Sequence, residues 1–154
     1  SDVYKRQVDT IRRWRNGGKF DGKMLTEDQK HIYNIYQRIL TLCNKEKAIT
    51  EGEFFDLMYA NANGWRFNEH KQYTFLRKAG KELLFIIVNF DHISVDVAIN
   101  VPSHAFDFLQ IPQMDVYPAV DLLTGKTESI SLLPYKATEI SVEGYSGKIL
   151  KIKL

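Results

Sequence analysis

The sequence lacks the features that mark several large classes of protein. It has a single cysteine, Cys43, so no disulfide can form within the chain. Its longest apolar run, residues 83–88, is far shorter than the roughly 20 residues that a membrane-spanning helix needs. No signal-peptide pattern opens the chain, and the sequence does not indicate a cellular compartment.

Neither sign of charge dominates. The 154 residues include 21 basic and 19 acidic side chains, for a net charge of +2. Phosphate binding needs a concentrated basic face, so this balance argues against nucleic acid as the main partner. With 44% apolar and 26% charged residues, the chain can bury a packed core.

Motifs for nucleophilic and phosphate chemistry are missing as well. The chain has no GxSxG sequence, and Gly17 and Gly18 lack the lysine and spacing of a P-loop. The histidines have no paired spacing that would organise a zinc site. They are His31, His70, His92 and His104. We therefore predict no metal and no cofactor.

One acidic cluster is the strongest candidate in the sequence for acid–base catalysis. Glu51, Glu53 and Asp56 lie close in sequence, and glycoside hydrolysis uses two carboxylates about 5–10 Å apart. Acidic side chains are mostly exposed, however, and a solvated strand edge explains this cluster better. We assign no catalytic residue.

Two regular patterns are present. Thr26 and Gln29 form a capping box, and apolar residues then recur at helical spacing, which predicts one helix over residues 26–44. Residues 8–25 are basic, glycine-interrupted and predicted to be a loop. Its basic-aromatic cluster, Arg12, Arg13, Trp14 and Arg15, suits packing against a larger body, and the alternative is that it binds a phosphate or a carboxylate.

From residue 50 onward the apolar period changes to two. Short strands separated by turn signals, without intervening helices, predict an antiparallel Greek-key β-sandwich of about eight strands, preceded by the one helix. Strand 82–90 is apolar on both faces and is expected to be central, with a neighbouring domain or the helix on its outer side. The predicted strands are 53–59, 71–78, 82–90, 93–100, 115–121, 127–132, 137–142 and 147–154.

Aromatic residues around a loop rich in asparagine give the best binding signal. Tyr59, Trp65 and Tyr73 offer ring faces beside amide side chains, a combination that suits sugar rings. The alternative is that Tyr59 and Tyr73 are ordinary strand residues and that Trp65 covers the core.

Several segments, in order, resemble the C-terminal part of α-amylase-type glycoside hydrolases. The resemblance rests on WRNGGKFDG, LTEDQKHIYNIYQRILTLCNKEKAI, AITEGEF, YTFLRKAGKELLFIIVNFD, DLLTGK and GKILKIKL, between residues 12 and 154. It implies the last helix of a (β/α)8 barrel within residues 1–49, followed by a C-terminal β domain over residues 50–154. In that family the catalytic carboxylates stand on barrel strands, and none of those strand motifs occurs here.

The resemblance therefore implies a non-catalytic accessory domain of an enzyme acting on α-glucans, whose missing barrel is its partner. An alternative is a carbohydrate-binding module that contacts α-glucan through exposed aromatics. Apolar surface left without the barrel is expected to cause homo-oligomer formation. The opening residues SDVYKRQ do not continue the family pattern and look like translated adaptor sequence in a truncated metagenomic fragment, so no fold is expected of them.

Overall fold

The computed structural model describes residues 2–154, and the chain divides into two compact units. The first extends to Thr41 and the second covers Leu42–Leu154. Each unit is described by itself.

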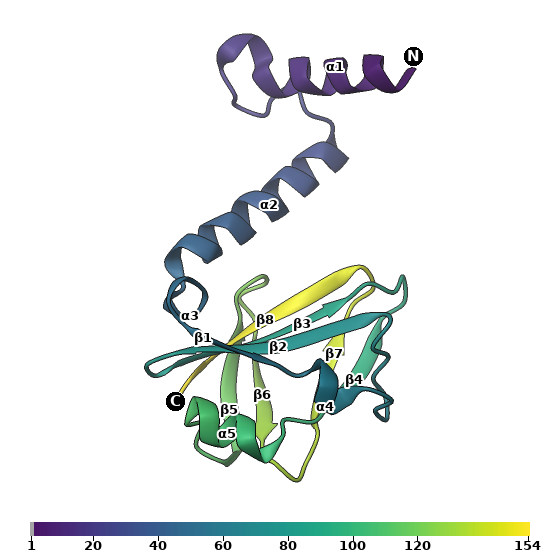
Figure 1. The fold of residues 1–154 in the computed structure, drawn as a ribbon. Coiled ribbons are helices and arrows are strands. Elements are labelled where there is room, and N and C mark those ends of the chain that lie inside the picture. Colours follow the sequence, from purple (N-terminus) through teal and green to yellow (C-terminus); the bar gives the residue numbers. More distant parts are fainter. Residues whose placement is uncertain (1) are drawn as a thin grey trace. The chain divides into compact units, whose positions relative to one another are not determined.

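The first unit is helical (Figure 1). Helix α1 covers Asp2–Arg15 and is followed by a 3-10 turn, η1, at Asn16–Gly18. The predicted loop over residues 8–25 is wrong for residues 8–15, and residues 2–7, of which no fold was expected, are helical too. The helix dipole explains part of this, because an acidic residue stands in the first turn of α1 and three arginines stand in its last turn. After Arg15 the backbone turns to positive φ, at 40° for Asn16 and 65° for Gly17, and this ends the helix.

Helix α2, Glu27–Lys45, agrees with the predicted helix to within one residue and runs from the first unit into the second. The capping box is confirmed: the Thr26 amide donates to Gln29 Oε1 at 3.0 Å, and the Gln29 amide donates to Thr26 Oγ1 at 3.3 Å. No residue of α2 is buried. Its apolar stripe, including Ile32, Ile35, Tyr36 and Ile39, faces solvent.

The second unit is a β-sandwich-like domain of eight antiparallel strands, as predicted. One sheet has six strands in the order β1-β2-β3-β8-β5-β6, and the other pairs β4 with β7. The last strand therefore lies inside the large sheet, between β3 and β5 (Figure 1). The strands are β1 Glu53–Asp56, β2 Gln72–Ala79, β3 Glu82–Asn89, β4 Val95–Ile99, β5 Met114–Asp121, β6 Thr127–Leu132, β7 Thr138–Val142 and β8 Ser146–Lys153.

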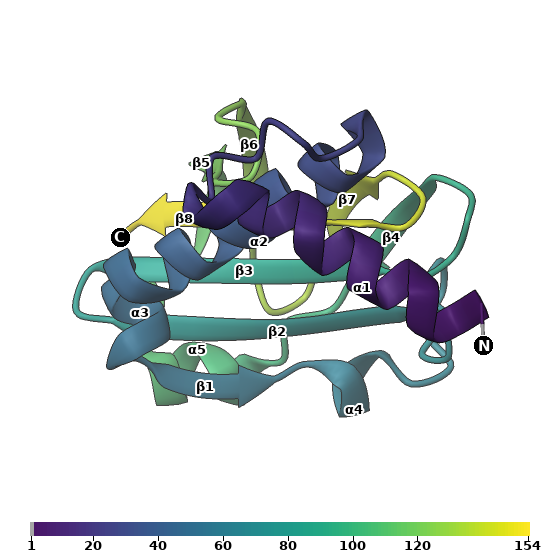
Figure 2. The same ribbon diagram turned by 90° about the horizontal axis from the view of Figure 1, so that it is seen from above.

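Strand β3 is central, as its composition predicts. It pairs along its whole length with β2 on one side and β8 on the other, and Figure 2 shows β2 and β3 side by side. Leu83, Phe85 and Ile87 point into the core between the sheets, where they are fully buried. Leu84 and Ile86 point to the outer face and are also buried there, packed with Ala48.

Three short helices were not predicted. Helix α3, Lys47–Thr50, precedes β1 and packs on the outer face of β2 and β3. Helix α4, Met58–Asn61, follows β1, and helix α5, Ser103–Leu109, connects β4 to β5. The residues that we predicted as the end of strand 53–59 lie in α4, and α5 begins after Pro102, which is its N-cap. Helices of four to seven residues are too short to show a clear apolar period.

Candidate functional site

The outer face of the large sheet carries a polar clamp that fastens α3 to the strands. Glu82 Oε1 accepts a hydrogen bond from the Ala48 amide at 2.9 Å. Arg77 donates through Nε to the Ala48 carbonyl at 2.8 Å and through Nη2 to the Gly52 carbonyl at 2.7 Å. These bonds satisfy backbone groups at both ends of α3, a helix that is too short to be stable by itself. We call Glu46, Ala48, Arg77, Glu82 and Lys151 the α3 clamp.

Lys151 of β8 is the charged centre of the clamp. Its Nζ lies 2.5 Å from Glu46 Oε2 and 2.8 Å from Glu82 Oε2. Burial alone raises the pKa of Glu82, but the hydrogen bonds from Lys151 and the Ala48 amide outweigh burial and hold that pKa below its usual value. Burial likewise lowers the pKa of Lys151, and its bonds to Glu46 and Glu82 more than reverse this, so the pKa is raised. The clamp therefore fixes the segment that follows α2 on the sheet.

Beside the clamp, the same outer face of the sheet is apolar. Phe75, Val88 and Ile149 are only partly buried there, around the buried Leu84 and Ile86. Phe54 of β1 is 47% exposed and contacts Phe75 at a ring distance of 5.3 Å. A sheet face of this composition normally lies against another layer of the protein. We call Phe54, Tyr73, Phe75, Val88, Val120 and Ile149 the outer apolar face.

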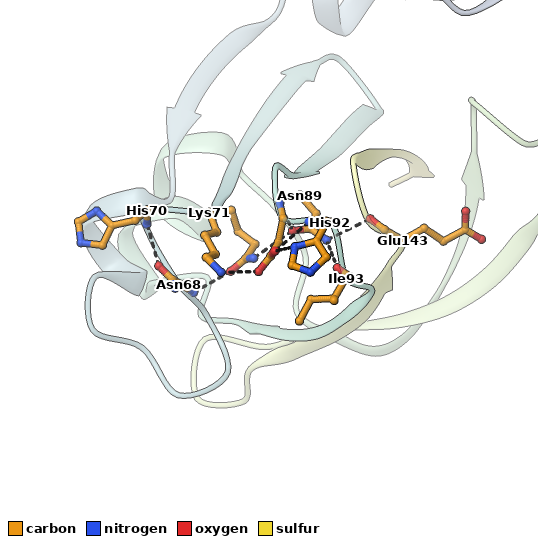
Figure 3. A network of polar contacts seen from close by, with 9 residues as sticks. Asn68, His70, Lys71, Asn89, His92, Ile93 and Glu143 are labelled. Carbon is orange, nitrogen blue, oxygen red and sulfur yellow. Dashed lines mark hydrogen bonds and ion pairs between the residues drawn. The ribbon is translucent and has the colours of Figure 1, made fainter. Parts of the chain in front are cut away.

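A polar network lies at the end of β3 that is opposite to the α3 clamp (Figure 3). Asn89 Nδ2 donates to the carbonyls of Ile93 and Glu143, and this ties the turn after β3 to the β7–β8 turn. The Asp91 carboxylate accepts from Lys71 Nζ at 2.7 Å and lies 2.9 Å from His92 Nδ1. The Lys71 hydrogen bond, with help from His92, holds the pKa of Asp91 below its usual value. The network holds the turn after β3 and the β7–β8 turn together.

The three aromatic residues proposed for sugar binding lie in three different settings. Tyr59 is on α4 and contacts the rings of Phe55 and His104. Tyr73 is on β2, where it packs on Phe75 of the outer apolar face. Trp65 lies in the loop before β2, is 72% exposed, and has the Arg66 guanidinium 5.1 Å from its ring centre.

Arg66 holds the Trp65 loop against the small sheet. Its Nε donates to the Asp96 carbonyl at 2.9 Å and its Nη1 donates to Glu139 at 3.2 Å. The guanidinium is therefore fixed beside the indole ring, and the tryptophan stays exposed instead of covering the core.

An aromatic patch that sequence reasoning missed lies between β1, α4 and α5. His104 and Phe108 of α5 contact Phe55 at ring distances of 5.1 and 5.9 Å. Tyr59 Oη and His104 Nε2 are 2.7 Å apart. Phe55 and Tyr59 are close in sequence, but α5 follows more than 40 residues later, so only the fold brings the two segments together. We call Phe55, Tyr59, His104 and Phe108 the aromatic patch.

Acidic residues do not converge on a reactive centre at the sequence cluster 51–56. Glu51 and Glu53 are exposed, and Asp56 accepts a hydrogen bond from the Met58 amide at 2.9 Å. Elsewhere, a groove of about 400 Å³ is lined by polar and apolar residues, with Asp96, Asp121, Glu128 and Glu143 among them. Within it, Lys148 bonds to Glu128, Thr124 to Asp121 and Ser141 to Asp96.

No helix within residues 2–154 is long and apolar enough to cross a membrane. No group of three or more histidine, cysteine, aspartate or glutamate side chains in this range is placed to hold a metal ion.

Comparison with known proteins gave matches among solved structures. No protein-family model matches the chain, and no curated protein matches it. The maltogenic α-amylase AmyB from Thermotoga neapolitana matches with a TM-score of 0.62 at 14% identity, over 86% of this chain and 27% of that one. The α-amylase of Geobacillus thermoleovorans, complexed with acarbose, matches with a TM-score of 0.57 at 12% identity, over 87% and 26%. AmyP in complex with maltose matches with a TM-score of 0.58 at 21% identity, over 86% and 23%.

This chain thus spans about a quarter of the length of the solved structures that it matches. At these identities the likeness is one of fold. At that level, the predicted resemblance to α-amylase-type enzymes is confirmed.

Proposed function

We propose that this chain is a non-catalytic accessory domain of an α-amylase-type glycosidase, and that it supports a (β/α)8 barrel carried by a longer parent polypeptide. The main support for this proposal is the α3 clamp. It holds the segment that directly follows α2 on the β domain. On this account α2 is the last barrel helix, and the clamp fixes the segment after α2 to the sandwich.

The surfaces left uncovered support the same role. The stripe of α2 is exposed, with Ile32 55% and Tyr36 65% accessible, although helices with such a stripe normally bury it. The outer apolar face of the sheet is also partly exposed. A barrel in contact with both surfaces would bury them. The match to about a quarter of each α-amylase fits a supporting domain.

Phe54→Asp tests the support role in the parent polypeptide that includes the barrel. In the isolated 154-residue chain Phe54 is already half exposed, so the change should cost less than about 0.5 kcal/mol of stability. In the parent polypeptide, Phe54→Asp places an unpaired charge in a buried interface and should lower the free energy of unfolding by about 2 kcal/mol or more. Tyr135→Asp, at a 79% exposed position in the β6–β7 turn, is the matched control. Equal small losses for Phe54→Asp in both polypeptides would show that the barrel does not cover this face.

Absence of catalysis is tested on the isolated chain. We expect the purified 154 residues to release no reducing sugar from soluble starch or maltotetraose. Release that survives repurification and is lost with an acidic-residue variant would overturn the non-catalytic role.

A second function, contact with α-glucan, is favoured by the Trp65 setting. An exposed indole that is held from one side by a fixed guanidinium offers a rigid apolar platform for a sugar ring. Maltoheptaose should then quench tryptophan fluorescence. The quenching should disappear in Trp65→Phe and persist in Trp14→Phe, and no quenching at millimolar sugar would exclude this function for Trp65.

A further inference from the structure

A basic hollow lies where α3, the β2–β3 turn and the end of β8 meet. Its volume is about 630 Å³, and four lysines and two glutamates are among the residues that line it. All of its lining residues belong to the second unit of the chain. The charged residues of this basic hollow are Lys47, Glu51, Lys81, Glu82, Lys151 and Lys153.

Three of the four lysines have no counter-charge. Lys151 is the exception, because the carboxylates of the α3 clamp hold its ammonium group. Lys47, Lys81 and Lys153 are exposed, and none of them forms an ion pair with a side chain of residues 2–154. Glu51 is the one acidic lining residue outside the clamp. The basic hollow therefore has an excess of unpaired positive charge.

The strand register explains why Lys153 is left unpaired. Lys153 of β8 lies directly opposite Glu82 of β3, and opposite charges in that position normally attract each other. Glu82 instead accepts a hydrogen bond from the Ala48 amide at 2.9 Å and lies 2.8 Å from Lys151 Nζ. The clamp thus takes the carboxylate that would otherwise neutralise Lys153.

The backbone that carries the three unpaired lysines is fixed. The bond from the Ala48 amide to Glu82 holds α3, in which Lys47 is the first residue. The Lys81 carbonyl accepts a hydrogen bond from the Leu154 amide at 2.9 Å, which ties the β2–β3 turn to the end of β8. A ligand that binds in the hollow therefore orders lysine side chains and leaves the backbone as it is, which keeps the entropic cost of binding low.

Unpaired lysines around a recess match the chemistry of an oxyanion that carries several charges. An ammonium group is a compact charge with three donors and no acceptor, and lysine is a common ligand of phosphate. Because the three lysines come from three separate segments, a ligand with two linked phosphates reaches more of them than a single small ion does. Nucleic acid fits less well, since it needs an extended basic face and acidic side chains border this hollow.

We propose that the basic hollow is a binding site for a diphosphate group, in which Lys47, Lys81 and Lys153 supply the positive charge. This site is separate from the outer apolar face and from Trp65. It depends on neither the support role nor the contact with α-glucan.

Isothermal titration of the 154-residue chain with inorganic pyrophosphate at low ionic strength tests the site. Lys47→Met, Lys81→Met and Lys153→Met should each weaken binding about 2- to 5-fold, the effect of one exposed charge pair, and the triple variant should weaken it at least about 10-fold. Glu51→Gln removes a repelling charge and should tighten binding about 2-fold, which a damaged fold would not do. Lys126→Met, at an exposed lysine in the β5–β6 turn, is the matched control and should bind normally. Circular dichroism checks that each variant is folded.

A second titration, with ADP, separates the two sources of a diphosphate group. Tighter binding of ADP than of pyrophosphate assigns the hollow to an organic diphosphate, and equal binding assigns it to the free anion. In both cases the same three lysine variants should weaken binding, and added salt should weaken it further because salt screens exposed charges.

Three results would overturn the proposal. No binding of pyrophosphate or ADP at millimolar concentration removes the site. Equal weakening by Lys126→Met and by the lysine variants of the hollow reduces the effect to the net charge of the chain. Unchanged binding in the triple variant places the anion elsewhere, with the arginines of residues 12–15 as the next candidates. None of these results bears on the support role, which the Phe54→Asp comparison tests.

Discussion

Lys151 shows how single side chains fix a short helix to a sheet. Its ammonium group lies between two carboxylates, and the exposed fractions of the Glu46 and Glu82 side chains are only 12% and 20%. An ammonium group in this position offsets the cost of keeping two acids partly dehydrated.

Lys151→Met should lower the free energy of unfolding by about 2 kcal/mol, because it leaves both acids without their charged partner. Lys153→Met is the matched control, since Lys153 lies two residues along the same strand and is exposed. Urea denaturation followed by circular dichroism measures both. If the two variants lose the same stability, the clamp does not stabilise the domain.

The clamp should also give a defined pH range of stability. Because the pKa of Glu82 is lowered, its contribution is present above the unfolded value of about 4.3 and is lost as the pH falls through the folded pKa. Because the pKa of Lys151 is raised, its contribution is present below about 10.4 and is lost as the pH rises through the folded pKa. The stability difference between wild type and Lys151→Met should therefore be largest between these limits. A difference that stays constant from pH 3 to pH 11 would be inconsistent with this origin.

Asp91 provides a second acid-sensitive contact, at the other end of β3. Its lowered pKa means that its contribution is present above the unfolded value of about 3.9 and disappears as the pH falls through the folded value. Asp91→Asn should therefore melt at a lower temperature than wild type at pH 7, and this gap in melting temperature should be smaller at pH 3. Asp115→Asn, at a 71% exposed carboxylate paired with Lys136, should show almost no gap at either pH. Thermal melts at pH 7 and pH 3 measure both gaps.

Among the elements, α2 and β3 differ most in how they are stabilised. Six of the eight residues of β3 are buried, and the exceptions are Glu82 and Val88. No residue of α2 is buried. An isolated helix in water is only marginally stable, and a strand in the middle of a sheet opens only with the whole domain.

Amide hydrogen exchange should separate these two elements. In dilute solution, the amides of residues 31–41 should exchange orders of magnitude faster than those of residues 83–88. Comparable slow exchange in both segments would mean that α2 is packed even in the single chain, contrary to its exposed apolar stripe.

Sequence periodicity predicted the long elements and missed the short ones. Helix α2 and all eight strands were recognisable because each repeats its apolar period often enough, and the unbroken apolar run of β3 gave its central place. Helix α1 was missed because residues 1–7 were set aside as adaptor-like and residues 8–15 were assigned to a glycine-interrupted loop. The clamp and the aromatic patch could not be predicted, because Lys151 lies about 100 residues after Glu46, and His104 45 residues after Tyr59.

For the whole molecule, the two uncovered surfaces should make the isolated chain self-associate. The stripe of α2 and the outer apolar face both carry exposed large apolar side chains, and exposed apolar patches drive association. Sedimentation velocity should show dimers or larger oligomers as concentration rises, and Ile35→Glu with Tyr36→Glu should reduce them. A monomer of unchanged sedimentation coefficient at high concentration would contradict this expectation.

We propose that this polypeptide supports a (β/α)8 barrel that carries the reactive carboxylates in a longer parent polypeptide. The most direct test is to sequence the source DNA that precedes this coding sequence. The account predicts an open reading frame, continuous with this one, that encodes repeated strand–helix units and the aspartate and glutamate motifs of an α-amylase-type barrel. An in-frame stop, or a frame encoding an unrelated domain, would contradict it.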